Sequence, residues 1–270
     1  MIWTPLALIS VLVCLHLSAQ PNLGGSYHLG AICKDGIVIG TDSRGNLFYN
    51  AEKPLAYFDT VQKVFAIKHC ILSIVGLIGI QNKFLWSYLE EFKSTIPDDI
   101  APTQLLQQLY NFVKEKYPTA FKDYIKLHMI CAGYVNGVAL MCAVNGESGN
   151  CAENKGIARG DTLSLFSLDK KYTDQYCLNR SCAEVGHEIE KAILDYPKRH
   201  HCHDKIGGPV MLLMVSKTGT VKWLKGRPPA IRWKTIDDFW SDFKRKKVTI
   251  HFEDSSYKKK MYQQLNIPLK

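Results

Sequence analysis

The chain contains no internal repeat and no low-complexity linker, which excludes repeat architectures. Its 46% hydrophobic and 22% charged residues are typical of a globular protein and exclude collagen, coiled coil and wholesale disorder. The first apolar run, 6–17, supplies only about 12 of the roughly 20 apolar residues that a membrane-spanning helix needs. With 270 residues the chain has room for one large domain or two small ones.

The first five residues also lack Lys and Arg, although export signals usually begin with positive charge. The apolar run 6–17 is followed by Ser18-Ala19-Gln20-Pro21, small residues of the kind that signal peptidase accepts. We therefore expect residues 1–19 to be a cleaved signal peptide and the mature protein to be secreted or periplasmic. No membrane contact is expected after cleavage. The alternative is an uncleaved amino-terminal anchor.

Positive charge is in excess and is unevenly distributed. The net charge is +9, which raises the question of an acidic partner. In the basic extension, 226–270, eleven Lys and Arg stand against five Asp and Glu. The clusters 244–247 and 258–260 lie there among Trp233, Phe239, Trp240 and Phe243. Such clusters can bind nucleic acid or anionic lipid. We expect instead that the aromatic residues contact the body of the fold or a neighbouring subunit, and that the chain binds no nucleic acid.

Turn signals and hydrophobic periodicity predict an alternation of hairpins and helices. Asp35-Gly36 and Asn136-Gly137 are strong hairpin-turn pairs. Helices are predicted where apolar residues recur at helical spacing, and strands where β-rich runs are short. The expected strands are 27–33, 37–41, 63–67, 70–75, 128–135, 138–144, 210–216 and 221–224, and the expected helices are 82–92, 104–117 and 183–196. This order indicates an α+β fold, with two antiparallel sheets packed together and covered by helices.

The segment after the expected signal is the most informative. It begins Gly24-Gly25-Ser26-Tyr27-His28, runs through a turn at Gly36, and ends its second strand in Asp42-Ser43-Arg44. This arrangement resembles the amino terminus of a proteasome β-type subunit, an N-terminal nucleophile hydrolase. In that family a Gly precedes the catalytic Thr, and an Asp-x-Arg motif follows the second strand. Ser26 falls on the Thr position, and the step to Asp42 matches without a gap.

The resemblance extends over roughly residues 25–224. Lys63 begins a strand, as the catalytic Lys of the family does, after a short insertion. Gly76 ends the next strand, where the family places a backbone N–H that stabilises an oxyanion. Asp204 lies in a segment that resembles the Asp-containing loop before a Gly-Gly pair and a strand.

The resemblance implies a domain organisation. The implied parts after the signal peptide are a six-residue pro-segment, 20–25, an N-terminal nucleophile hydrolase domain, 26–225, and the basic extension, 226–270. The implied fold is a four-layer αββα sandwich of two antiparallel sheets. Proteasome relatives form rings, so the resemblance implies a homo-oligomer. It implies no cofactor.

The implied chemistry is amide hydrolysis through an acyl-enzyme on Ser26. An alcohol needs a base within hydrogen-bond reach, and the α-amine of a first residue can serve, because its pKa lies near neutrality. Attack by Ser26 on the Gly25 carbonyl would remove the pro-segment. Lys63, kept charged by Asp42, would favour proton loss from Ser26, and the Gly76 N–H would meet the oxyanion. The substrate would be a peptide or a small amide.

Two departures from the family pattern support an alternative. The family places a Ser in a Gly-Ser-Gly segment of the second sheet, where this chain has Ala158-Arg159-Gly160. The family also has a Ser shortly after the later Asp, and the segment 204–207 lacks one. Both Ser residues help to orient the terminal amine. The alternative is therefore a catalytically inactive structural or binding subunit of the same fold.

Nine cysteines are present, and eight lie outside the expected signal, an even number that disulfides would allow. Counting back from Asn136-Gly137 places Cys131 opposite Cys142, as a bridge or as two buried thiols. Cys177 and Cys182 flank a short polar loop and form a second candidate bridge. The segment 197–204 holds three His, a Cys and an Asp. Adjacent ligands on a short loop diverge, so no metal site is predicted.

Overall fold

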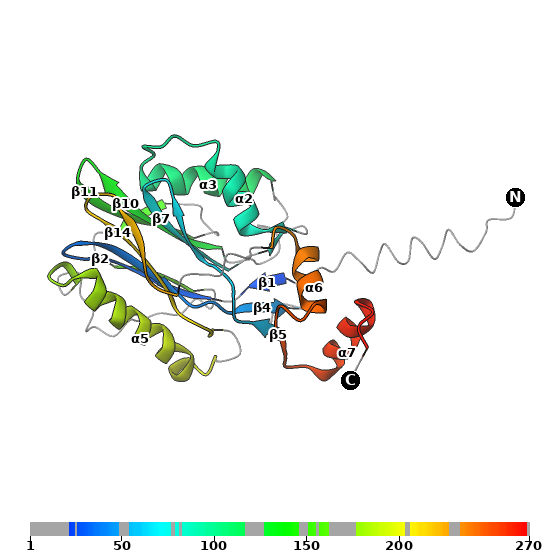
Figure 1. Cartoon of the computed structure of the whole chain (residues 1–270). Coiled ribbons are helices and arrows are strands. Elements are labelled where there is room, and N and C mark those ends of the chain that lie inside the picture. Colours follow the sequence, from blue (N-terminus) through cyan, green and yellow to red (C-terminus); the bar gives the residue numbers. More distant parts are fainter. Residues whose placement is uncertain are drawn as a thin grey trace, which may run out of the picture.

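The computed structural model describes most of the chain after the expected signal. The described residues are 22–24, 26–48, 54–76, 79–80, 83–116, 127–145, 151–154, 157–161, 177–202, 206–226 and 233–268. Within them the fold is mixed, with antiparallel sheets and five helices. Figure 1 shows the sheets at the centre, one long helix on one side and two helices on the other.

The first five-stranded sheet contains the predicted amino-terminal hairpin. Its strand order is β13-β2-β3-β14-β15. The bounds are Ile157–Asp161 for β13, Tyr27–Ile32 for β2, Gly36–Thr41 for β3, Met211–Ser216 for β14 and Val221–Lys225 for β15. Both predicted hairpins of this sheet are confirmed, whereas β13 was not predicted.

The second five-stranded sheet has the order β12-β11-β10-β7-β6. Its strands are β12, Cys151–Asn154; β11, Val138–Asn145; β10, His128–Val135; β7, Cys70–Val75; and β6, Val64–Ile67. The register counted from the Asn136-Gly137 turn is confirmed, because Val135 lies opposite Val138 and Cys131 opposite Cys142. The turn residues Asn136-Gly137 therefore predicted the pairing of this hairpin correctly.

Apolar side chains from both five-stranded sheets meet in one core. This core includes Ile37 and Ile39 from the first sheet and Ile71, Ile130 and Met141 from the second. The alternation of the strands explains the arrangement, because successive side chains point to opposite faces of a sheet. On β2, the odd-numbered residues from Tyr27 to Cys33 instead join a second core.

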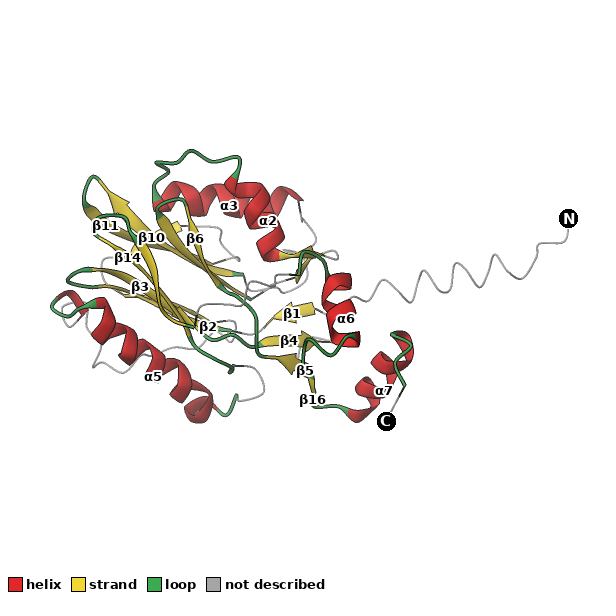
Figure 2. Cartoon of the chain, viewed as in Figure 1, coloured by secondary structure: helices red, strands yellow, loops and turns green. Residues whose placement is uncertain are grey.

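Three helices cover the outer faces of these sheets (Figure 2). Helix α5, Cys182–His200, packs on β2 and β3. The approach is close, since a Cβ on Gly40 would lie 2.5 Å from Ile189 Cγ2. Helix α3, Pro102–Lys116, packs on β10 and β11, and its buried residues belong to the same core as those of α2, Leu85–Lys93. All three helices were predicted from their periodicity.

Two further sheets correct the prediction of only two. A four-stranded sheet has the order β1-β4-β5-β16, and β8 pairs with β9 as a two-stranded sheet. Its strands are β1, Asn22–Gly24; β4, Gly45–Phe48; β5, Pro54–Phe58; and β16, His251–Phe252; the smaller sheet joins β8, Gly79–Ile80, to β9, Lys83–Phe84. Strands β4 and β5 were not predicted, and they lie between Asp42 and Lys63, the stretch that contains the short insertion relative to the family pattern.

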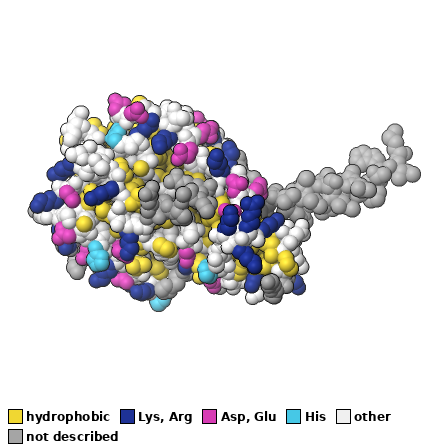
Figure 3. All heavy atoms as spheres, viewed as in Figure 1, with side chains coloured by type: hydrophobic (Ala, Val, Ile, Leu, Met, Phe, Trp, Pro, Cys, Tyr) yellow, Lys and Arg dark blue, Asp and Glu magenta, His cyan; other side chains and the backbone are white. Residues whose placement is uncertain are grey.

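The basic extension is folded onto the body of the protein. Helix α6, Ile236–Lys244, and helix α7, Ser255–Gln264, follow one another near the four-stranded sheet (Figure 1). Trp233, Phe239 and Trp240 are buried in the same core as Phe58 and Phe84. The expectation that these aromatic residues contact the fold is confirmed. In the surface view, Lys and Arg side chains gather over α6 (Figure 3).

The cysteines whose side chains the structure describes are buried thiols. They are Cys33, Cys70, Cys131, Cys142, Cys177, Cys182 and Cys202. The Cys142 thiol donates to the Cys131 carbonyl at 3.5 Å. Of the two possibilities for this pair, a disulfide or two buried thiols, the structure has the two thiols. Cys177 and Cys182 form no bridge either. Among the described helices, none combines the length and the apolar character needed to span a bilayer.

Candidate active site

A buried ion pair lies at the centre of the candidate site. Lys63 Nζ donates to both carboxylate oxygens of Asp42, at 3.1 Å to Oδ1 and 3.0 Å to Oδ2. Both side chains are completely excluded from solvent. Lys63 immediately precedes β6 and Asp42 immediately follows β3, so each of the five-stranded sheets supplies one partner.

Backbone N–H groups surround the Asp42 carboxylate. Oδ1 accepts from the Tyr27 N–H at 2.9 Å. Oδ2 accepts from the Arg44 N–H at 3.1 Å and from the Gly207 N–H at 3.3 Å. Buried charges are tolerated only where paired and hydrogen-bonded, and this carboxylate meets both conditions. Its position is consequently fixed from three separate segments of the chain.

Burial moves the two pKa values of the pair toward one another. The loss of hydration raises the pKa of the Asp42 carboxyl, and the Lys63 charge and the backbone donors oppose this rise. Burial lowers the pKa of the Lys63 amine, against the attraction of Asp42. A lysine with a lowered pKa releases its proton more readily than an exposed one, and the Asp42 carboxylate counteracts this effect at Lys63.

Ser26 lies at the entry to β2 and is completely buried. The next residue, Tyr27, donates its N–H to Asp42 and accepts from the Asp42 N–H at 3.3 Å, which fixes the backbone beside Ser26. The Tyr27 ring stacks on Tyr196 of α5 with centroids 4.2 Å apart. Because strand side chains alternate, Ser26 is assigned to the opposite face, toward the second sheet.

His28 shares that face and was not identified from the sequence. It is completely buried, and its Nδ1 lies 2.9 Å from Ser73 Oγ of β7. Its Nε2 is buried and has no hydrogen-bond partner among the residues that the structure describes. Burial, followed by the charges of His128 and Lys63, holds the pKa of His28 well below 6.5. Its position two residues after Ser26, at the strand period, was the signal that could have revealed it.

Gly76 and Asp204 complete the predicted set. Gly76 directly follows β7 and has a φ of 105°, a conformation that favours glycine. It stands two residues beyond Ile74, whose N–H donates to the Lys63 carbonyl at 2.9 Å, so the register brings it to the same end of the sheet as Lys63. Asp204 and Gly25 lie outside the described residues.

The segment that departs from the family pattern lies beside β2. In the β13–β2 pairing, Ala158 is opposite Gly30, Gly160 is opposite His28, and Asp161 is opposite Tyr27. Residues 158–160 therefore run along the strand that follows Ser26, although no Ser is present there.

The loop after β3 is braced against the segment 206–208. Arg44 makes a two-pronged contact with Asp59, from Nε at 2.7 Å and Nη2 at 2.9 Å. Its guanidinium also lies 3.7 Å from the Tyr57 ring centroid. Ser43 donates its N–H to the Gly207 carbonyl at 3.2 Å. Gly208 has a φ of 73°, and a Cβ there would lie 2.7 Å from Ser43 Oγ, so the close approach requires glycine.

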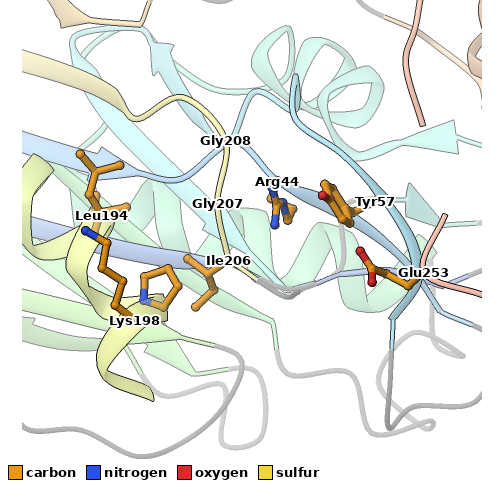
Figure 4. Close-up of a pocket in the computed structure, with 10 residues that line it drawn as sticks. Arg44, Tyr57, Leu194, Lys198, Ile206, Gly207, Gly208 and Glu253 are labelled. Atoms are coloured by element: carbon orange, nitrogen blue, oxygen red, sulfur yellow. The ribbon is translucent and has the colours of Figure 1, made fainter. Parts of the chain in front are cut away.

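A pocket of 540 Å³ adjoins this braced loop. Its wall includes Arg44, Tyr57, residues of α5, the segment 206–208 and Glu253 (Figure 4). Arg44 and Gly207 both line the pocket. The backbone N–H of each also donates to the Asp42 carboxylate. The pocket therefore adjoins the buried ion pair but is formed by other side chains.

Within the described ranges no group of three or more His, Cys, Asp or Glu side chains could hold a metal ion. Of the His-rich segment 197–204, the residues from His203 onward lie outside those ranges. No protein-family model matches the chain. A search of curated proteins likewise finds no significant match.

Proposed function

We propose that the protein is an N-terminal nucleophile amidohydrolase of the proteasome β type, with Ser26 as nucleophile. The observation that carries this proposal is the buried Asp42–Lys63 pair, held by the N–H of the residue next to Ser26. The family resemblance placed Asp42 and Lys63 at the positions of the catalytic Asp and Lys. The finer fold assignment, a four-layer αββα sandwich, belongs to the proposal, and the core shared by the two five-stranded sheets supports it.

In the proposed reaction, the α-amine of a liberated Ser26 takes the Oγ proton. The Oγ–carbon bond forms at the amide carbonyl, and the Gly76 N–H stabilises the oxyanion. The C–N bond then breaks, and the leaving amine takes the proton. Water next attacks the acyl-enzyme, which releases the carboxylic acid and restores Ser26. Lys63, beside Asp42, lowers the cost of proton loss from Ser26 by its charge.

The placement of β1 supports self-processing. Its residues Asn22–Gly24 pair antiparallel with β4, with Gly24 opposite Asn46. Strand β8 lies beside β1 as well. Residues 22–24 of the expected pro-segment are therefore extended and paired with a sheet edge, as peptides bound by strand addition are. A peptide or small-amide substrate, export after signal cleavage and ring assembly are parts of the same proposal.

The decisive experiment compares wild-type protein with Ser26→Ala after secretion, by intact mass and amino-terminal sequencing. Wild type should yield a chain that begins at Ser26 and reacts with an acyl-trapping probe. Ser26→Ala should retain residues 20–25 and lose the labelling. Ser94→Ala, at an exposed serine after α2, is the matched control and should behave as wild type. A wild-type chain that never begins at Ser26 would refute the mechanism.

The second candidate is an inactive subunit of the same fold. The absence of Ser in residues 158–160, beside β2, favours it specifically. This candidate predicts an unprocessed chain without labelling in both wild type and Ser26→Ala.

A further inference from the structure

The pocket beside the 206–208 segment is an open pocket with the volume of a ligand site. Its volume of 540 Å³ lies within the range of about 300–1,000 Å³ that is usual for small-molecule pockets. Helix α5 and strand β5 build half of the wall, and the loop after β3, the segment 206–208 and the residue after β16 build the other half. The braced contacts of Arg44 and Gly208 make this wall largely preformed.

One side of the pocket is apolar and open. Leu194 on α5 is 47% exposed, although large hydrophobic side chains are mostly buried elsewhere in the described chain. Pro197 and Ile206 also line the pocket but are themselves buried. An aliphatic side chain of a ligand would therefore remove mainly the exposed surface of Leu194 from water.

Arg44 does not supply a binding charge. Its guanidinium is engaged by both carboxylate oxygens of Asp59 and stacks on Tyr57. The Arg44–Tyr57 stack is therefore a rigid part of the wall, not a counter-ion for a ligand.

The other two charged side chains of the pocket wall, Lys198 and Glu253, have opposite signs and lie on opposite sides of the pocket. Figure 4 shows Lys198 and Leu194 on one side of the 206–208 segment and Glu253 with Tyr57 on the other. Lys198 is 67% exposed and contacts only Asp195 of its own helix among the described residues, at 3.4 Å. Glu253 is exposed and forms no ion pair within the described chain. A purely anionic ligand would be repelled by Glu253, and a purely cationic one by Lys198.

We propose that this pocket binds a short zwitterionic peptide with an aliphatic side chain. Its ammonium group lies at Glu253, its carboxylate at Lys198, and its side chain against Leu194 and Pro197. This site is distinct from Ser26, and its occupation does not require any hydrolytic activity.

Calorimetric titration of the full-length protein with leucyl-leucine tests the proposal. Lys198→Met and Glu253→Gln should each weaken binding about tenfold, because each removes one charge-assisted hydrogen bond. N-acetyl-leucyl-leucine and leucyl-leucine amide should lose about as much, since each lacks one of the two charges. Lys191→Met on α5 and Glu115→Gln on α3 are matched controls outside the pocket and should bind as wild type.

The outcomes separate this site from the proposed hydrolase. Ser26→Ala should bind leucyl-leucine as wild type does, whether or not Ser26 is a nucleophile. Equal affinity for the free and blocked peptides would overturn the proposal, as would the absence of saturable binding at millimolar peptide. Loss of binding in the control variants would place the peptide elsewhere and also overturn it.

Discussion

Asp42 and Lys63 form a pair in which neither residue can be replaced alone without leaving a buried charge. Removal of one partner from such a pair usually costs about 3–5 kcal/mol. Asp42→Asn and Lys63→Met should therefore each lower the free energy of unfolding by about 3–5 kcal/mol, measured by urea denaturation. Lys68→Met, at the exposed pair with Asp98, should cost less than about 1 kcal/mol. Equal losses at the two pairs would contradict the burial of Asp42 and Lys63.

His28 gives the stability a defined pH dependence. Its pKa in the folded protein is lowered below 6.5 by burial, so the unfolded chain binds the proton more tightly. Its contribution is present in full above pH 6.5 and is lost as the pH falls from there through the folded-state pKa. His28→Gln should flatten the decline of the unfolding free energy over that interval, in denaturation series at several pH values. His187→Gln, at an exposed site on α5, should leave the slope unchanged.

At the scale of elements, α6 packs on the body through Ile236, Phe239 and Trp240, of which Phe239 is the most deeply buried. This ring lies 4.6 Å from the Phe58 ring and 5.0 Å from that of Trp233, centroid to centroid. Phe239→Ala should destabilise the protein by about 3–5 kcal/mol, because it leaves a cavity in the core. Phe243→Ala, at a half-buried position on the same helix, should cost clearly less in thermal unfolding. A similar cost for both would mean that α6 is not anchored by this ring.

Elements with strong local signals were predictable from the sequence, and those without were not. The Asn136-Gly137 hairpin followed from turn chemistry, and α3 from its apolar spacing. Strands β4 and β5 pair with each other and are only 4 and 5 residues long, too short for a clear periodicity in the sequence. Helix α6 carried an overlooked signal, the capping box in which Thr235 and Asp238 bond each other's backbone N–H.

At the scale of the whole molecule, the sequence motif located only part of the candidate site. Asp42 and Lys63 were placed by resemblance, and the structure joins them. His28 was missed because the partners that define its environment, Ser73 and His128, come from another sheet. The role of Gly207 as a donor to Asp42 depends on a contact between residues 165 positions apart, which no local pattern can predict.

That long-range contact ties the site to the completion of folding. Asp42 receives its donors from Tyr27, Lys63 and Gly207, and the last of these becomes available only after most of the chain has been synthesised. Contacts of such sequence separation form late, because the entropy of closing the chain must first be overcome. A nascent or truncated chain thus holds the same residues without their arrangement. A chain that ends before Gly207 therefore lacks one of the donors that hold the buried Asp42–Lys63 pair in place.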